Sequence, residues 1–151
     1  MGLFQGFDIS ASGMTAQQFR MDIIAENIAN VNTTRTEDGT PYKRQVVRFE
    51  EKEMRDKFGH VLSHAKARAT KYSGNGVKVA EVFEDNETDD IMEYDPSHPD
   101  ADENGYVHYP NVNTVTEMTN LIDASRAYEA SATAFDALKA TAQAGLNIGS
   151  R

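Results

Sequence analysis

The sequence contains no cysteine and no tryptophan, and its strongly apolar residues are few. The missing cysteine excludes disulfide bonds, thiolate nucleophiles and cysteine-ligated zinc or iron–sulfur sites. Leu, Ile, Val and Phe together account for only 29 of the 151 residues, and the formal net charge is −9. Chains of this composition lie near the boundary of autonomous folding, because they have little apolar surface to bury. We therefore expect a small core and a chain that needs a partner to complete it.

Long apolar runs and an excess of positive charge are also missing. No run approaches the roughly 20 apolar residues that cross a bilayer, so no direct membrane insertion is predicted. The first residues lack the basic and apolar segments of a cleaved signal peptide. The negative net charge argues against nucleic acid as a partner. What is abundant is alanine, with 18 residues, and this favours helices.

The charges that are present are separated along the chain. Residues 41–80 carry 10 basic and 4 acidic residues, whereas residues 81–110 carry 11 acidic residues and no basic residue. Two interpretations stay open, because the two blocks could pair within one subunit or attract neighbouring subunits.

A first long helix is predicted over residues 8–31, with Asp8 and Ser10 as candidate N-caps. Its apolar residues form two adjacent stripes with heptad spacing, which predicts contact with two neighbours or, more simply, an amphipathic core helix. The first stripe is a candidate assembly seam, and the second is expected to face neighbouring subunits. The seam consists of Met14, Met21, Ile24, Ile28 and Val31, and the intersubunit stripe of Ile9, Ala16 and Ile23.

A second long helix is predicted from about residue 114. Leu121, Tyr128 and Phe135 are spaced by seven residues, and Leu138 flanks them. Nine alanines between residues 124 and 144 would let another helix approach closely. We expect these residues to pack against the seam of the first helix, since neither helix has a full core alone.

The middle of the chain has the composition of β-structure. Strands are predicted over residues 42–50 and, after a glycine turn and with a slip at Ala80, over residues 77–84. Residues 85–105 are acidic and predict an exposed loop, and residues 106–109 are strand-like. The predicted fold class is α+β, in which terminal helices pair as a coiled coil around a small, hairpin-like β-rich domain. The predicted domains are residues 1–35, 36–112 and 113–151.

Few residues suggest chemistry. Asp100, Asp102, Asn104 and Gly105 match the first half of an EF-hand loop, but Asn111 stands where the last Ca²⁺ ligand belongs. A small Ca²⁺-binding or adaptor module that uses residues 100–105 is the alternative hypothesis. His60 and His64 have helical spacing but lack the glutamate of a metalloprotease motif. We expect no catalytic residues, no cofactor and no metal ion, and hence no enzyme.

Several segments together resemble a known family. Residues 9–17 (ISASGMTAQ) and 24–33 (IAENIANVNT) resemble the N-terminal signature of the bacterial flagellar rod and hook proteins. Residues 41–45 (PYKRQ), 98–107 (HPDADENGYV) and 109–113 (YPNVN) narrow the resemblance to a proximal-rod member. The asparagines and the proline of these motifs are candidate family residues: Asn27, Asn30, Asn32, Pro110, Asn111 and Asn113.

The resemblance implies a structural role. Family members are exported unfolded, without a cleaved signal, through the flagellar type III export apparatus. They assemble with other rod subunits and with copies of themselves into the basal-body rod. This helical tube crosses the periplasm and transmits motor torque to the hook. The terminal helices would form its inner coiled-coil layer, and the β-rich middle would lie further out.

Overall fold

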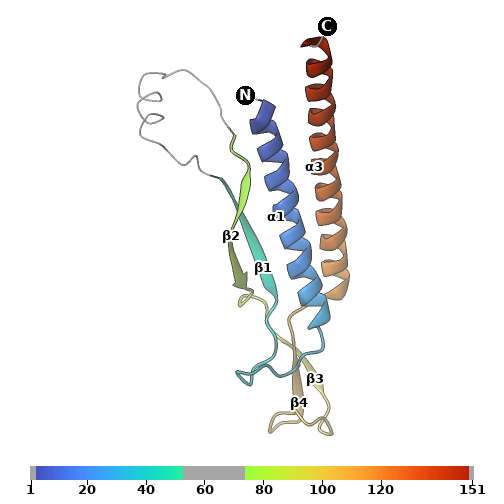
Figure 1. The fold of residues 1–151 in the computed structure, drawn as a ribbon. Helices are drawn as coiled ribbons and strands as arrows, with labels where there is room; N and C mark the ends of the chain where they lie inside the picture. The colour runs from blue at the N-terminus through green and yellow to red at the C-terminus, as the bar shows by residue number, and fades with distance from the viewer. Residues whose placement is uncertain (1–2, 53–73, 150–151) are drawn as a thin grey trace, which may run out of the picture.

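The computed structural model describes residues 3–52 and 74–149, which form two long helices and two small antiparallel sheets (Figure 1). This confirms the predicted α+β class. His60 and His64 lie outside the described residues. The elements are, in chain order, α1 (Leu3–Ala29), β1 (Gln45–Glu51), β2 (Val77–Glu84), β3 (Ile91–Tyr94), β4 (Tyr106–Tyr109) and α3 (Thr114–Gly149).

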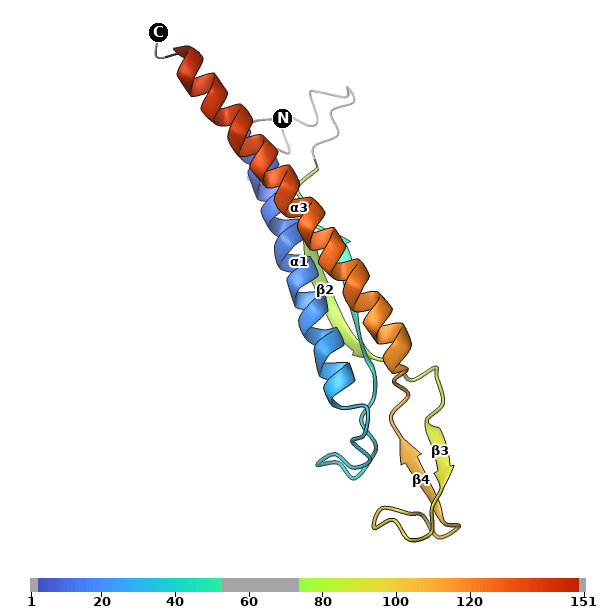
Figure 2. The ribbon, with the colours of Figure 1, turned by 90° about the vertical axis from the view of Figure 1, so that its right-hand side faces the viewer.

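The two helices lie side by side and run antiparallel (Figures 1 and 2). Near the start of α1, the rings of Phe7 and Phe135 meet edge to face, with centroids 5.0 Å apart. At the end of α1, Asn27 bonds to Glu117 near the start of α3. The start of α1 therefore lies beside a late part of α3, and the end of α1 lies beside the start of α3.

Helix α1 begins earlier than the sequence predicts. Asp8 and Ser10 lie inside the helix, which already includes Leu3, so the prediction that they cap it is wrong. Phe135 and Leu138 of α3 lie against Phe7 and Gly6. Packing of this kind overrides a local capping preference, because most helix stability in proteins comes from tertiary contacts.

The β1–β2 sheet packs against α1 and is antiparallel. Its register shifts between Arg48 and Phe49, which pair with Glu81 and Val79, so that Ala80 is the extra residue of a β-bulge. The slip predicted at Ala80 is this bulge. At the start of β2, Gly76 has a φ of +91°, and a Cβ there would collide with the Ser12 hydroxyl of α1. Only glycine fits this approach of the sheet to the helix.

The second sheet corrects the prediction of a loop over residues 85–105. Ile91–Tyr94 forms β3 and pairs with β4, from Ile91 opposite Tyr109 to Tyr94 opposite Tyr106. The acidic residues on both sides mask this short apolar and aromatic segment in the sequence. The β3–β4 hairpin contacts no other described helix or strand, and it extends beyond the ends of the helices (Figure 2).

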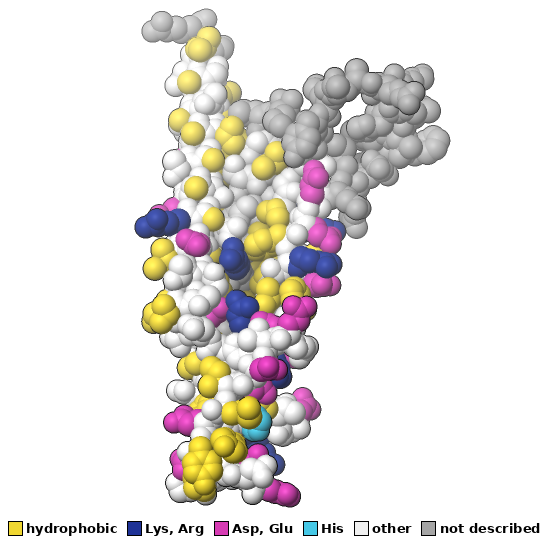
Figure 3. Space-filling model, turned by 180° about the vertical axis from the view of Figure 1, so that it is seen from behind, with side chains coloured by type: hydrophobic (Ala, Val, Ile, Leu, Met, Phe, Trp, Pro, Cys, Tyr) yellow, Lys and Arg dark blue, Asp and Glu magenta, His cyan; other side chains and the backbone are white. Residues whose placement is uncertain are grey.

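The apolar core is small, as the composition predicts. Figure 3 shows hydrophobic side chains exposed along α3 and at the hairpin end of the molecule. No described helix is long and apolar enough to span a bilayer. The buried hydrophobic residues are Ala16, Ile24, Val107, Val112 and Ala124.

Candidate functional site

The predicted seam residues are distributed along the α1–α3 pair. Ile24 is buried, and the other eight are partly buried. Phe135 and Leu138 contact α1 directly, at Phe7 and Gly6. Val31 lies in the turn after α1 rather than in the helix. The eight partly buried residues are Met14, Met21, Ile28, Val31, Leu121, Tyr128, Phe135 and Leu138.

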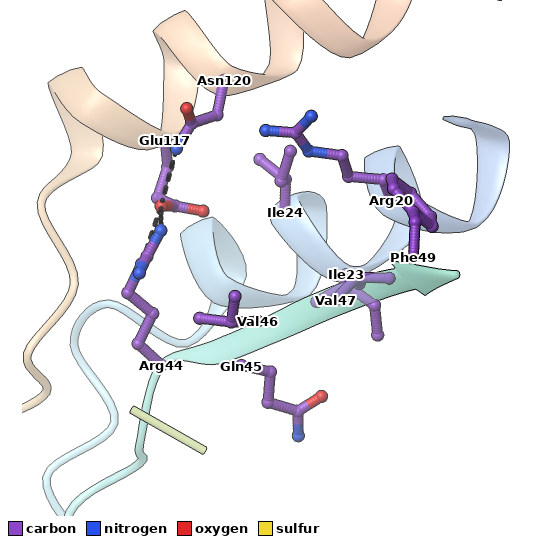
Figure 4. A pocket seen from close by; sticks show the side chains of 10 residues that line it. All are labelled: Arg20, Ile23, Ile24, Arg44, Gln45, Val46, Val47, Phe49, Glu117 and Asn120. Carbon is purple, nitrogen blue, oxygen red and sulfur yellow. Dashed lines mark hydrogen bonds and ion pairs between the residues drawn. The ribbon is translucent and has the colours of Figure 1, made fainter. Parts of the chain in front are cut away.

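The intersubunit stripe lies on the side of α1 that faces the β1–β2 sheet. Ala16 is 3 % exposed and lines an open groove between α1 and β2. Ile23 lines a cleft together with Phe49 and other residues of β1 (Figure 4). The backbone of Ile9 lies next to Gly76. At Ala16 the stripe is therefore covered by its own chain, because the sheet folds back onto α1. Contact of Ile9 and Ile23 with another subunit stays a prediction.

Small residues at the helix contact were not assigned to the seam from the sequence. A Cβ on Gly13 would lie 3.1 Å from Ser131 Oγ, and one on Gly6 would lie 3.1 Å from Leu138. Ala124 is fully buried. The heptad spacing of Ala124, Ser131 and Leu138 in the sequence could have revealed the α3 side of the contact between the helices.

Below the helix seam lies a buried polar junction, which joins α1, α3 and the start of β1. At its centre is Asn27, whose side chain is fully buried. Its amide nitrogen donates to Gln45 O (2.9 Å) and to Glu117 Oε2 (3.2 Å). Its amide oxygen accepts from Gln45 N and from the Tyr42 hydroxyl, both at 2.9 Å. One side chain of α1 thus holds the first residue of β1 and the carboxylate of α3.

The carboxylate of Glu117 is 1 % exposed, and its charge is balanced within the junction. Oε1 accepts from Arg44 Nε at 2.9 Å and Nη2 at 2.8 Å, and from Asn120 Nδ2 at 3.3 Å (Figure 4). A buried carboxylate is tolerated only when it is paired and hydrogen-bonded in this way. Arg44 also lies 3.5 Å from Asp85.

At the other edge of the junction, the side chain of Asn111 connects Arg44 to the segment that follows β2. Its oxygen accepts from Arg44 N at 2.9 Å, and its amide nitrogen donates to Asp85 O (2.7 Å) and Thr88 O (3.1 Å). The buried Pro110 precedes it. Asn113 then caps α3, because its oxygen accepts from the backbone nitrogens of Val115 and Thr116.

The two remaining family asparagines lie at the end of α1. Asn30 donates to Glu26 O and accepts from the Thr33 hydroxyl, so it closes the helix end. Asn32 is exposed in the following turn.

The junction shifts the pKa values of two groups. Burial, together with the negative charges of Glu26, Glu117 and Glu84, raises the pKa of Tyr42 to about 12. For Asp85, burial opposes ionisation, but hydrogen bonds from Thr88 and Glu87 and the charge of Arg44 hold its pKa below the usual value. The tyrosine therefore stays a neutral donor, and the aspartate stays charged beside Arg44.

The arrangement is structural, and comparison with known proteins agrees. A family model described as flagella basal body rod protein matches residues 7–35, and one described as flagellar basal body rod FlgEFG protein C-terminal matches residues 103–148. Flagellar basal-body rod protein FlgC of Bacillus subtilis is 39 % identical over 99 % of both chains. The proteins of that name from Borreliella burgdorferi and Escherichia coli O157:H7 are 40 % and 36 % identical, over 98 % and 99 % of both chains.

The chain belongs to the FlgC family of flagellar basal-body rod proteins. As a member of the FlgC family it is a non-enzymatic structural subunit of the basal-body rod, and rod-family membership implies assembly with other rod subunits. The family resemblance and the function predicted from the sequence are thereby confirmed. Asn27, Asn111 and Glu117 of the polar junction lie within the segments that match these rod-protein family models.

The loop that suggested Ca²⁺ binding has another use in this FlgC-family chain. Asp102 Oδ1 accepts from the backbone nitrogens of Asn104 and Tyr106, each at 2.8 Å, which fixes the turn into β4. Asp100 accepts from the Thr34 hydroxyl at 2.9 Å. Across residues 3–52 and 74–149, no group of three or more His, Asp or Glu side chains could hold a metal ion.

Described residues of the basic and acidic blocks meet within one chain of this FlgC-family subunit. Lys43 pairs with Asp90 at 2.6 Å, and Arg48 pairs with Glu81 at 3.3 Å. Together with Arg44 and Asp85, these pairs join residues 41–80 to residues 81–110. Pairing within one subunit, one of the two interpretations left open, therefore accounts for these charges.

Proposed function

We propose that this chain assembles, with other rod subunits and copies of itself, into the helical tube of the proximal rod. In this proposal residues 1–35 and 113–151 form the inner coiled-coil layer, and residues 36–112 form a middle domain further out. The tube crosses the periplasm and passes motor torque to the hook.

The observation that carries the proposal is a paired helix unit that remains apolar on its outside. Val115, Met118 and Ile122 follow one face of α3 and are 75 %, 53 % and 55 % exposed. In a monomer this apolar face stays exposed and contributes no buried surface, whereas helix packing between subunits would bury it. Burial against neighbours would also supply the core that the composition lacks.

Torque transmission requires that helices and sheet move as one body. The polar junction supports this, because Asn27, Arg44 and Glu117 connect α1, β1 and α3 by hydrogen bonds and an ion pair. Buried networks of this kind fix register and resist sliding. A twist applied to one helix of a subunit would then be transmitted to the other helix and to the sheet.

We also infer that the flagellar type III export apparatus delivers the chain. The absence of cysteine and the small core support this, since neither covalent links nor extensive packing would oppose unfolding for transport. Secretion that persists in cells without the export apparatus would contradict it.

The test of rod assembly is Phe135→Asp, introduced into cells whose own copy of the gene is deleted. A charge against the ring of Phe7 should separate the start of α1 from α3, so that the chain is lost from purified basal bodies and the cells do not swim. Phe135→Leu is the matched control, because it keeps an apolar side chain at this position. Normal motility of the Phe135→Asp cells would overturn the proposed role of the seam.

A further inference from the structure

The chain contains two asparagine–glycine pairs, Asn75–Gly76 and Asn104–Gly105. Asparagine is a chemically labile residue. It is most labile before glycine, because no Cβ hinders the approach of the glycine nitrogen to the asparagine side chain. Each pair is therefore a candidate site of spontaneous deamidation, and the structure shows in detail how the second pair is held.

Deamidation of Asn104 would proceed through a cyclic imide. The backbone nitrogen of Gly105 forms a bond to Asn104 Cγ, and the bond from Cγ to the side-chain nitrogen breaks. The proton of the glycine nitrogen passes to the side-chain nitrogen, which leaves as ammonia. Water then opens one of the two carbonyls of the succinimide ring, and the product is either aspartate or isoaspartate.

The turn that leads into β4 opposes this attack. The Gly105 nitrogen donates to Asp102 O at 3.0 Å, and ring closure would break this bond because it draws the nitrogen toward the Asn104 side chain. Asp102 Oδ1 accepts from the backbone nitrogens of Asn104 and Tyr106, each at 2.8 Å. Asp102 thus holds the reacting nitrogen and the residues on both sides of it.

The same glycine is required by the turn and is enclosed by its neighbours. Gly105 is buried and has a φ of +84°, which other residues rarely adopt. Its oxygen accepts from Asp95 N at 3.0 Å. A Cβ built on it would lie 3.0 Å from the ring of Tyr94 and 3.2 Å from Pro96. The labile pair is therefore a consequence of the turn, and the turn also restrains it.

The charge of Asp102 contributes to this restraint. Hydrogen bonds from the backbone nitrogen of Tyr106 and from the backbone and side chain of Asn104 hold the pKa of Asp102 below its ordinary value. The carboxylate thus also holds the side-chain amide that the reaction would expel. Hydrogen bonds to an ionised acceptor are stronger than those between neutral groups.

We propose that Asn104 is a latent deamidation site, which Asp102 keeps unreactive in the folded chain. The unfolded chain lacks the turn, so Asn104 reacts there like any asparagine before glycine. Isoaspartate would add a methylene group to the main chain directly before β4, whose Tyr106 pairs with Tyr94 of β3. Either product would also add a negative charge to residues 81–110, which already carry 11 acidic residues. The protection arises within one chain and does not depend on rod assembly.

Peptide mapping by mass spectrometry tests this protection. The full chain is kept at mildly alkaline pH, either folded or in denaturant, and the conversion of Asn104 to acid is followed with time. In denaturant, Asn75 is the internal standard, and the two asparagines should react at similar rates. In the folded chain, Asn104 should react at least about tenfold more slowly than in denaturant, because the turn must open before the ring can close.

Variants of the turn separate its hydrogen bonds from its charge. Asp102→Ala removes the carboxylate and should raise the rate at Asn104 in the folded chain by about tenfold. Glu103→Ala is the control of equal charge, since the exposed Glu103 also precedes Asn104, and it should keep the wild-type rate. Asp102→Asn keeps an acceptor oxygen and should react more slowly than Asp102→Ala. An unchanged rate at Asn75 shows that Asp102→Ala has not unfolded the rest of the chain.

Three results would overturn the proposal. The first is an equal rate at Asn104 in the folded and the denatured wild-type chain. The second is an Asp102→Ala chain that reacts at Asn104 no faster than the Glu103→Ala chain. The third is an Asp102→Asn chain that reacts as fast as Asp102→Ala, because the acceptor oxygen would then give no protection.

Discussion

The side chain of Asn27 makes four hydrogen bonds to three residues and is fully buried. No apolar residue could replace it, because the backbone of Gln45 and the carboxylate of Glu117 would then be buried without partners. The same reasoning applies to Glu117. Its loss would leave the Arg44 guanidinium, among the described residues, with the more distant carboxylate of Asp85. At the scale of single residues, polar groups specify how the elements meet.

Replacement of Asn27 therefore has a large expected effect. Asn27→Ala should lower the free energy of unfolding by about 2–4 kcal/mol, because it leaves buried donors and acceptors unpaired. Chemical denaturation followed by circular dichroism measures the change. Asn32→Ala is the control, since this asparagine is exposed and should stay within about 0.5 kcal/mol of the wild type. Equal effects of the two substitutions would contradict the role of the junction.

The raised pKa of Tyr42 predicts that the stability of the fold depends on pH. Its pKa is about 12 in the folded chain, against the ordinary value of 10.0. Between these pH values the unfolded chain loses a proton that the folded chain keeps, so stability falls as pH rises. The contribution is complete below the unfolded pKa and is lost as pH passes through the folded pKa. Titration of phenolate absorbance should show one tyrosine ionising late, and that step should be absent from Tyr42→Phe.

At the scale of elements, the glycines of the two helices differ in how closely a side chain of the other helix approaches them. A Cβ on Gly13 would lie 3.1 Å from Ser131 Oγ, whereas a Cβ on Gly145, near the end of α3, would have no described atom within 4 Å. Glycine costs a helix about 1 kcal/mol relative to alanine. The close contact compensates this cost at Gly13, and nothing within the chain does so at Gly145.

The two positions should thus respond in opposite ways to the same substitution. Gly13→Gln should lower the free energy of unfolding by about 1–3 kcal/mol, because its side chain forces the helices apart. Gly145→Gln should leave the stability of the free chain unchanged or slightly higher, because glutamine is a good helix former. Thermal unfolding of both variants measures the difference. A Gly13→Gln chain as stable as the wild type would show that the helices are not in close contact there.

The whole molecule is long and unevenly stabilised. Buried residues such as Ala16, Ile24 and Ala124 lie along α1 and α3, and Val107 is buried in β4, whereas Leu146 and Ile148 near the end of α3 are exposed. Local unfolding is expected first where few contacts are lost, because opening costs the least free energy there.

Hydrogen exchange should reveal this gradient. In the free chain we expect the slowest backbone exchange around Ile24 and Ala124, and fast exchange in the turns of α3 around the exposed Leu146 and Ile148. Assembly should then slow exchange in these turns of α3, because the proposed packing of helices between subunits would cover them. Mass spectrometry of the free chain and of purified rods measures both states. Protection of these turns of α3 already in the free chain would argue against their packing on other subunits.

Much of the fold was predictable from local pattern. Heptad spacing located both helices, and β-branched residues located β1 and β2 with the bulge at Ala80. Strand β3 was missed because acidic neighbours hide a four-residue segment that pairing with β4 stabilises. The start of α1 was misplaced because contacts with Phe135 and Leu138, rather than a cap, extend it.

The sequence by itself determined the class of protein, because composition, periodicity and the asparagine motifs depend only on residue order. It also determined that the core would be small. Only the tertiary structure decided what the motifs do, since Asn27, Arg44 and Glu117 are far apart in the chain and meet only through folding. It also decided that the intersubunit stripe is covered at Ala16 and that Lys43, Arg44 and Arg48 of the basic block pair with acidic residues of the same chain. Periodicity shows which residues share a face of a helix, but only packing shows what lies against that face.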